Sequence, residues 1–266
     1  MAYSKIRVER DGAIATITLA DPATLNAAGV DMAQELTQAF GEIASSDARA
    51  VILTGEGRGF CSGANLTAGG GPGQREAPSP DGPDAGSALE TVYNPFVTML
   101  RDYKLPIVTA VNGAAAGVGC SLALMGDIIV AAESAYFLQA FRRIGLIPDG
   151  GSTYLLPRMI GRARAMEMTL MGDKVPAATA LEWGLINRCV PDDQLMATAR
   201  DFAEKLASGP ASVSMIRQIM WRSLDASWAD QLWDERLIQR DASRTRDFGE
   251  GVRAFIEKRP AQFEGR

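Results

Sequence analysis

The residues best suited to acid–base chemistry lie in a turn rich in glycine and apolar side chains. Asp149 follows the segment 144–148 and precedes Gly150 and Gly151. A carboxylate held among leucine and isoleucine is poorly solvated, so its pKa rises and it can accept protons from carbon. The chain contains no histidine. Acid–base chemistry must therefore use Asp, Glu, Lys, Tyr or Cys, and Asp149 is the best-placed candidate.

Two other glycine-rich turns could supply backbone N–H donors. Residues 60–66 follow a predicted buried strand, and residues 112–119 lead from a second strand into a helix. Small residues let backbone N–H groups approach a ligand closely, and two such donors can hold an oxyanion. Either turn alone could equally serve only for packing. Together with an apolar-flanked carboxylate, the two turns indicate removal of a proton next to a carbonyl group.

Several other functions are disfavoured by the sequence. The turn at 117–119 lacks the third glycine of a dinucleotide fingerprint, and no GxxxxGK[ST] motif occurs. The absence of both histidine and a GxSxG motif argues against a serine hydrolase. A net charge of −5 argues against nucleic acid as a partner. Cys61, Cys120 and Cys189 have no CxxC spacing, so we expect neither a disulfide framework nor a zinc site.

The start of the chain has no apolar signal-peptide core, and no apolar run approaches the ~20 residues of a membrane-spanning helix. We therefore expect a cytoplasmic protein without a membrane partner.

The elements that must position these turns follow an α/β order. A hairpin is predicted over 6–19, a mobile loop over 67–87, strands over 50–54, 107–111 and 127–132, and helices over 30–43, 89–103 and 114–125. The repeated order of strand, glycine-rich turn and helix predicts parallel crossover units. Beyond residue 160 the pattern turns helical, with helices predicted over 163–171, 177–183, 194–208, 211–223 and 232–248.

Several segments resemble the crotonase superfamily, the enoyl-CoA hydratase/isomerase family, along almost the whole chain. They are residues 25–27, 60–66, 106–119, 127, 145–151, 157–158, 180–187 and 255–260. The resemblance implies an α/β fold: a crotonase-like spiral of ββα units over 1–200, then a helical region over 201–266 that drives formation of homotrimers or dimers of trimers. It also implies an acyl-CoA substrate, with no cofactor and no metal.

The same resemblance assigns roles to individual residues. The backbone N–H groups of Ala64 and Val118 would form an oxyanion hole, with the Val118 side chain pointing away from it. Contacts with acyl-CoA would come from Thr24, Leu25, Ala27, Ser62, Ala64, Asn65, Leu66, Gly117, Val118, Ser121, Phe141 and Lys258. Thr24 replaces a more usual basic residue, and Asn65 replaces the common aspartate.

The catalytic positions distinguish members of the family. Ser121 and Phe141 stand where hydratases carry the two glutamates that position and activate water, whereas Asp149 aligns with the single acid/base of enoyl-CoA isomerases. A dehalogenase branch also has an aspartate at this position. Residues 139–151 and 250–263 are similar to the branch that isomerises ring-1,2-epoxyphenylacetyl-CoA. We therefore predict an acyl-CoA isomerase of fatty acid or phenylacetate metabolism. Three alternatives stay open: a hydratase that activates water with Asp149 alone, a non-catalytic acyl-CoA-binding protein, and an acyl-CoA hydrolase.

Overall fold

The computed structural model describes residues 3–65, 84 and 86–266, so Leu66 and most of the predicted loop 67–87 lie outside the described residues. The strands form two sheets. The larger has the spatial order β1 (Ile6–Asp11), β2 (Ile14–Leu19), β3 (Ala50–Gly55), β5 (Ile107–Val111), β7 (Ile128–Ala132) and β10 (Arg188–Val190). The smaller has the order β4 (Gly59–Cys61), β6 (Ala114–Ala116), β8 (Tyr136–Leu138) and β9 (Val175–Pro176).

From β3 to β8, successive strands alternate between the two sheets. The chain passes from β3 to β4, from β5 to β6 and from β7 to β8, and a helical segment follows each pair. Strands β2, β3, β5, β7 and β10 pair in parallel, as do β4, β6 and β8. Each turn of this spiral is a ββα unit, so the predicted fold class is confirmed.

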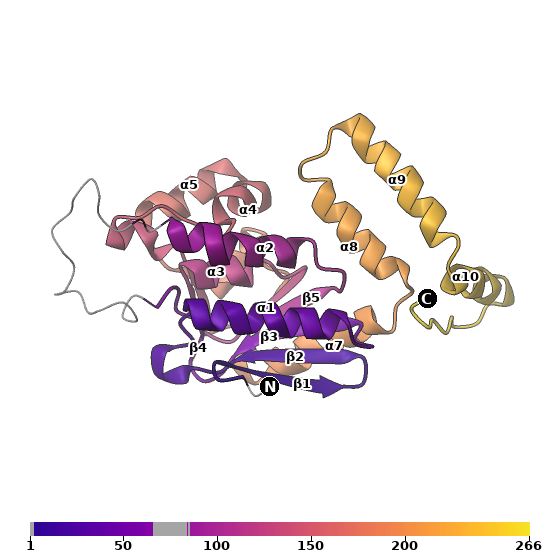
Figure 1. The fold of residues 1–266 in the computed structure, drawn as a ribbon, viewed down its shortest axis with the longest axis horizontal. Coiled ribbons are helices and arrows are strands. Elements are labelled where there is room, and N and C mark those ends of the chain that lie inside the picture. Colours follow the sequence, from indigo (N-terminus) through magenta and orange to yellow (C-terminus); the bar gives the residue numbers. More distant parts are fainter. Residues whose placement is uncertain (1–2, 66–83, 85) are drawn as a thin grey trace.

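The helices cover both sides of the larger sheet and extend beyond it (Figure 1). They are α1 (Val30–Ala44), α2 (Asn94–Arg101), α3 (Val118–Ala123), α4 (Ser152–Met159), α5 (Gly161–Met171), α6 (Ala177–Glu182), α7 (Leu195–Ala207), α8 (Ser212–Arg222), α9 (Trp228–Ala242) and α10 (Arg246–Glu257). Four shorter segments are η1 (Pro22–Thr24), η2 (Leu89–Tyr93), η3 (Ala140–Ile144) and η4 (Asp192–Gln194). Helix α7 packs on β3, β5 and β7, so the sheet core extends through Ala207.

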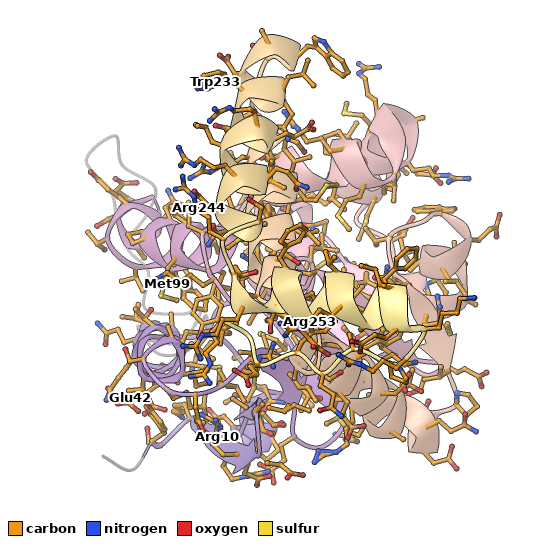
Figure 2. The ribbon with its side chains drawn as sticks, turned by 90° about the vertical axis from the view of Figure 1, so that its right-hand side faces the viewer. Arg10, Glu42, Met99, Trp233, Arg244 and Arg253 are labelled. Carbon is orange, nitrogen blue, oxygen red and sulfur yellow. The ribbon has the colours of Figure 1, made fainter. Side chains whose placement is uncertain are left out.

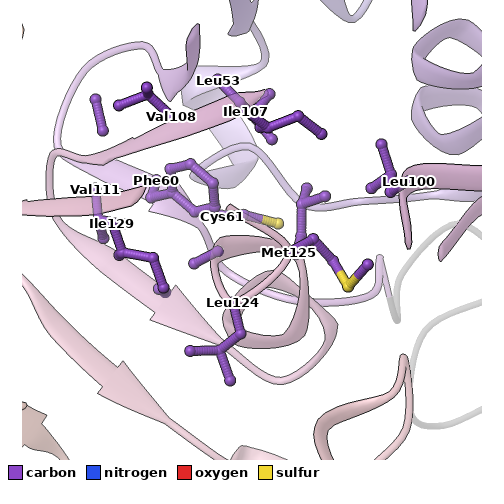
Figure 3. Close-up of a cluster of buried hydrophobic side chains, with 14 of the residues drawn as sticks. Leu53, Phe60, Cys61, Leu100, Ile107, Val108, Val111, Leu124, Met125 and Ile129 are labelled. Atoms are coloured by element: carbon purple, nitrogen blue, oxygen red, sulfur yellow. The ribbon is translucent and has the colours of Figure 1, made fainter. Parts of the chain in front are cut away.

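The core lies where the sheets meet helix α3, all of whose residues are buried. Strands β3 and β5 have every residue but Gly55 buried, which is why they read as continuous apolar runs. Figure 3 shows this cluster, formed by Leu53, Phe60, Cys61, Leu100, Ile107, Val108, Val111, Leu124, Met125 and Ile129. Because α3 is enclosed on all sides, the turn that begins it is held in a fixed position.

Helices α8, α9 and α10 form a C-terminal arm (residues 212–257) that projects from the core (Figure 1). The buried Arg217 of α8 anchors the arm: its guanidinium donates to Asp127 at 2.7 Å and to the carbonyl oxygens of Leu100, Arg101 and Tyr103. Trp233 lies on α9 at the outer end of the arm (Figure 2).

Some predicted element boundaries were wrong. The helix predicted over 232–248 is two helices, because Thr245 caps the start of α10 by accepting a hydrogen bond from the Phe248 N–H. The smaller sheet was missed because its strands have two or three residues, too few to show a two-residue periodicity. The helix predicted over 114–125 begins with one of these strands, β6.

Candidate active site

The two glycine-rich turns touch through their backbones. Gly63 has φ +107°, and a Cβ atom there would lie 3.0 Å from the Ala116 carbonyl oxygen. Gly117 has φ +54°, and a Cβ atom there would lie 3.7 Å from the Cα of Gly63. Any other residue type would be strained in φ at either position, and at Gly63 its Cβ would also press on the Ala116 carbonyl oxygen. The structure therefore brings Ala64 and Val118, the residues that follow these glycines, to one place.

The N–H groups of Ala64 and Val118 are available to a ligand. Val118 is the first residue of α3, so its N–H has no partner within the helix. Among the described residues, neither N–H has a hydrogen-bond acceptor. Two backbone donors on adjoining turns can stabilise negative charge on a carbonyl oxygen.

Asp149 lies beside α3, in the loop between η3 and α4. Gly150 is buried with φ +60°, and a Cβ atom there would lie 2.8 Å from Ser121 Cβ and 3.3 Å from Val118 Cγ2. The loop main chain is thus in contact with the helix that carries one oxyanion donor. The Val118 side chain faces this loop and forms an apolar wall next to Asp149.

The carboxyl group of Asp149 is poorly solvated. The side chain is half-buried, and its Oδ1 has no hydrogen-bond partner among the described residues. Burial raises the pKa of Asp149 from 3.8 to about 6. A carboxylate of this basicity can take a proton at neutral pH and return it in the next step.

The source of this burial differs from the sequence-based expectation. The chain neighbours Ile144, Leu146 and Ile147 are 50%, 44% and 80% exposed, so they do not enclose the carboxylate. Residues distant in the sequence pack on the neighbouring Gly150, among them Val118 and Ser121. Tyr93 of η2 is also near, because the charge of Asp149, after burial, contributes to raising the Tyr93 pKa to about 12.

The predicted acyl-CoA contacts within residues 24–27 and within residues 62–65 also come together. The N–H of Ser62 donates to the Leu25 carbonyl at 3.0 Å, and its hydroxyl donates to the Thr24 carbonyl at 2.8 Å. The N–H of Ala27 donates to the Thr24 hydroxyl at 3.1 Å. Residues 24–27 therefore lie against residues 61–65. Buried Asn26 holds this arrangement by donating to the carbonyls of Glu56 and Gly59.

Of the other predicted acyl-CoA contacts, Phe141 and Ser121 lie near the two turns and Asp149, whereas Lys258 does not. The buried ring of Phe141 would be 3.8 Å from a Cβ at Gly117, so it borders the oxyanion turn. The buried Ser121 hydroxyl donates to the main-chain carbonyl of Asp149 at 2.8 Å. Lys258 caps the end of α10, on the opposite side of the chain from α3 (Figure 1), so one chain does not bring it to the site.

Sequence reasoning missed two residues near Asp149. Tyr93 reaches the site from η2, and its hydroxyl donates to the Ala28 carbonyl at 2.7 Å. Ser152 of α4 donates to the Asp149 carbonyl from its hydroxyl at 2.8 Å and from its N–H at 3.2 Å. The position of Ser152 three residues after Asp149, at a helix start, was a usable signal. No local pattern marks Tyr93.

A cavity of about 460 Å³ lies on the other side of the Asp149 loop, between Leu146, Ile147 and Pro148 and helices α4 and α5. Ala64, Val118 and Asp149 do not line it. It is therefore separate from the place where the two oxyanion turns meet. Within the described residues, no helix is long and apolar enough to cross a membrane.

The spiral of ββα units, with two adjoining glycine-rich turns and a half-buried carboxylate, defines the class of fold to which the protein belongs. The sequence profile of the enoyl-CoA hydratase/isomerase family matches residues 9–266. The chain belongs to this family.

Relatives within the family carry different names. The chain is 43% identical to the "Probable enoyl-CoA hydratase" of Rhodobacter capsulatus, with all of both proteins aligned. It is 42% identical to the 1,2-epoxyphenylacetyl-CoA isomerase of Escherichia coli, over 95% of each protein. The crystal structure of an enoyl-CoA hydratase from Bacillus anthracis superimposes with a TM-score of 0.89 at 30% identity, covering 99% of this chain and 100% of that one.

Proposed function

We propose that this protein is an acyl-CoA isomerase that uses Asp149 as its single acid/base. The observation that carries the proposal is a half-buried carboxylate whose Oδ1 has no hydrogen-bond donor among the described residues, in a loop packed on the helix that begins at Val118. This arrangement suits a substrate whose acidic proton lies next to a thioester carbonyl, because the enolate oxygen needs donors and the proton needs a base.

The proposed reaction moves a double bond within the substrate and consumes no second reactant. The thioester oxygen accepts hydrogen bonds from the N–H groups of Ala64 and Val118. Asp149 removes a C2 proton from a 3-enoyl-CoA, and the electron pair spreads into a dienolate. The carboxyl group returns the proton at C4, which gives the 2-enoyl-CoA and restores the carboxylate. Each amide donor contributes ~3–4 kcal/mol at comparable sites, and a positioned acid/base contributes ~10²–10⁴-fold.

The choice of isomerase over hydratase rests on the groups around Asp149. Hydration requires a water held beside C3, and hydratases of the family use two glutamates for it. Here the Ser121 hydroxyl donates a hydrogen bond to the Asp149 main-chain carbonyl, and the Phe141 ring is a hydrocarbon that cannot bind water. Hydration stays the second candidate, because a relative 43% identical to this chain carries a hydratase name.

An assay with a panel of CoA thioesters tests the proposal. The panel contains a 3-enoyl-CoA, crotonyl-CoA and 1,2-epoxyphenylacetyl-CoA, the last chosen because of the name of the Escherichia coli relative. Wild type should isomerise the 3-enoyl or the epoxide thioester, with little loss of the crotonyl-CoA enoyl absorbance and no release of free thiol. The Asp149→Asn variant should lose activity by ~10²–10⁴-fold while still binding the thioester in calorimetry. Full activity of Asp149→Asn on every substrate would exclude Asp149 from the mechanism.

The same proposal includes assembly of several copies of the chain. The C-terminal arm exposes large apolar side chains, including Trp228 at 80% and Phe255 at 84%, that one chain leaves uncovered. We propose that they pack on a neighbouring copy in a trimer or a dimer of trimers, and that Lys258 then contacts acyl-CoA bound by that neighbour. Sedimentation of wild type and Phe255→Asp tests this, since a monomeric wild type would contradict it.

A further inference from the structure

We infer that Ser121 is a positioning residue for Asp149. It fixes the main chain at Asp149 so that the carboxylate stays shielded from solvent. This inference deepens the proposed function and rests on Asp149 as the base of the reaction. It concerns a residue that the family resemblance places among the substrate contacts and at a position where hydratases carry a glutamate, without giving it a role in isomerisation.

Ser121 lies on the same face of α3 as the oxyanion donor. It follows Val118 by three residues, so the two side chains are neighbours on the helix surface. Ser121 is fully buried, and its hydroxyl donates to the Asp149 carbonyl at 2.8 Å. The same short helix therefore carries the amide that would hold the thioester oxygen, at its first residue, and the hydroxyl that binds the main chain of Asp149.

The hydrogen bonds at Asp149 are distributed unequally. Its main-chain carbonyl accepts from the Ser121 hydroxyl, the Ser152 hydroxyl and the Ser152 N–H, at 2.8, 2.8 and 3.2 Å. Its carboxyl Oδ1 accepts none from the described residues. The two bonds from Ser152 are local to the start of α4. Among the described residues, the bond from Ser121 is the one that ties Asp149 to a distant segment.

Close packing makes this anchor specific for a small side chain. A Cβ atom at Gly150 would lie 2.8 Å from Ser121 Cβ and 3.1 Å from its Oγ, so the loop backbone rests directly on Ser121. A longer side chain that extended along the Ser121 Oγ direction would collide with this loop. Serine is short enough to fit and still provides a donor, which alanine lacks.

The Ser121 bond adds a long-range restraint to Asp149, since the N–H groups of Gly145 and Leu146 bond only to the nearby carbonyls of Arg142 and Phe141. Gly145, Gly150 and Gly151 all have positive φ, and Leu146 and Ile147 face solvent. If the Ser121 bond is lost, the Asp149 carboxylate can turn toward water, where its charged form is favoured and its basicity falls. A shift of ~1 Å at a reacting group costs up to ~10²-fold in rate.

Asp149 should titrate without interference from groups packed around it. Tyr93, from η2, has its pKa raised to about 12 chiefly by burial. Cys120, the neighbour of Ser121 on α3, also has its pKa raised by burial to about 12. Arg142 and Arg143 of η3 are held by the carbonyl oxygens of Met171 and Gly172. Neither Tyr93 nor Cys120 therefore titrates between pH 4 and 7, and a change in that range is assigned to Asp149 by its loss in Asp149→Asn.

The test compares Ser121→Ala with Thr109→Val as a matched control. Thr109 is also fully buried, and its hydroxyl donates to the Ala123 carbonyl of the same helix at 2.9 Å. Both variants remove a buried hydroxyl that donates to a main-chain carbonyl, from α3 in Ser121 and to α3 in Thr109, so both should lose a similar amount of stability. Thr109 does not contact the Asp149 loop.

We expect Ser121→Ala to lower kcat by ~10–10²-fold, to leave KM within ~3-fold, and to move the acidic limb of the kcat/KM profile to lower pH. Thr109→Val should change neither kcat nor the pH profile. If Ser121→Ala loses stability as Thr109→Val does but keeps the wild-type kcat and acidic limb, the inference is overturned.

A measurement without substrate separates this inference from the proposed function. Carbon-13 NMR of the aspartate carboxyl groups, with the Asp149 signal assigned by its loss in Asp149→Asn, follows the titration of Asp149 directly. A lower Asp149 pKa in Ser121→Ala supports positioning by Ser121 even if Asp149→Asn is fully active, in which case the proposed function fails. An unchanged Asp149 titration overturns the inference whatever the reaction is.

Discussion

A Cβ atom at Gly63 would lie 3.0 Å from the carbonyl oxygen of Ala116, so the two turns that carry the oxyanion donors leave no space between them. The N–H groups of Ala64 and Val118 can converge only because glycine stands at this contact. The proposed oxyanion hole should therefore be sensitive to a single methyl group added at Gly63.

Replacement of Gly63 by alanine should therefore impair catalysis more than stability. The new methyl group would separate the turns and misalign one donor, so we expect kcat to fall by ~10–10³-fold with a small change in KM. Gly12→Ala is the control, because Gly12 also has positive φ (+56°) but has no atom within 4 Å of its Cβ position. Steady-state kinetics of both variants check this, and equal activities would contradict the convergence of the two turns.

The pH dependence of the reaction should report the pKa of Asp149. Burial raises this pKa to about 6, and only the deprotonated carboxylate can remove the C2 proton. We expect kcat/KM to be level above pH 7 and to fall about tenfold per pH unit well below pH 6. A profile that stays level down to pH 4.5 would contradict the role of Asp149 as base.

The Val118 side chain should contribute to the high pKa of Asp149. Its Cγ2 lies 3.3 Å from a Cβ position at Gly150, so it excludes water next to the Asp149 loop. Val118→Ala should admit water and move the acidic limb of kcat/KM down by up to ~1 pH unit. Val108→Ala is the control. It also removes two methyl groups, but from the buried core at β5, and should leave the acidic limb of kcat/KM unchanged.

The Asp149→Asn variant should be more stable than wild type at neutral pH. The pKa of Asp149 is higher in the folded state, so the folded protein binds this proton more tightly and loses stability as pH rises from about 4 to about 6. Asparagine has no such titration. After allowance for solvent screening of a partly exposed group, we expect a gain of about 1–2 kcal/mol at pH 7.5 that shrinks toward pH 4.5. Denaturant unfolding at the two pH values measures it, and a constant difference would contradict the raised pKa.

The C-terminal arm should depend on Arg217. This buried guanidinium pairs with Asp127 and donates to three carbonyl oxygens, and Trp221 donates to the same carboxylate at 2.8 Å. Arg217→Met would leave Asp127 and the carbonyls without this donor, at an expected cost of about 3–5 kcal/mol. Arg217→Lys, which keeps the charge, should lose less. Chemical unfolding measures both, and a loss below about 1 kcal/mol for Arg217→Met would exclude the anchor.

The sequence by itself determined the repeating strand and helix order, the two glycine-rich turns and the choice of Asp149. Short runs rich in β-branched residues, such as 107–111, are typical of buried strands, and a chain without histidine narrows the choice of acid/base groups. These features depend on the chemistry of neighbouring residues, so they can be read along the chain.

Tertiary structure alone decided what surrounds Asp149. The apolar neighbours of Asp149 in the chain face solvent, whereas Val118, Ser121 and Tyr93 come to it from other elements. The short strands β4, β6 and β8 place these elements, yet they are too short to have a periodicity of their own. Solvation depends on which atoms lie within a few ångströms in space, and sequence neighbours at a turn are free to point outward.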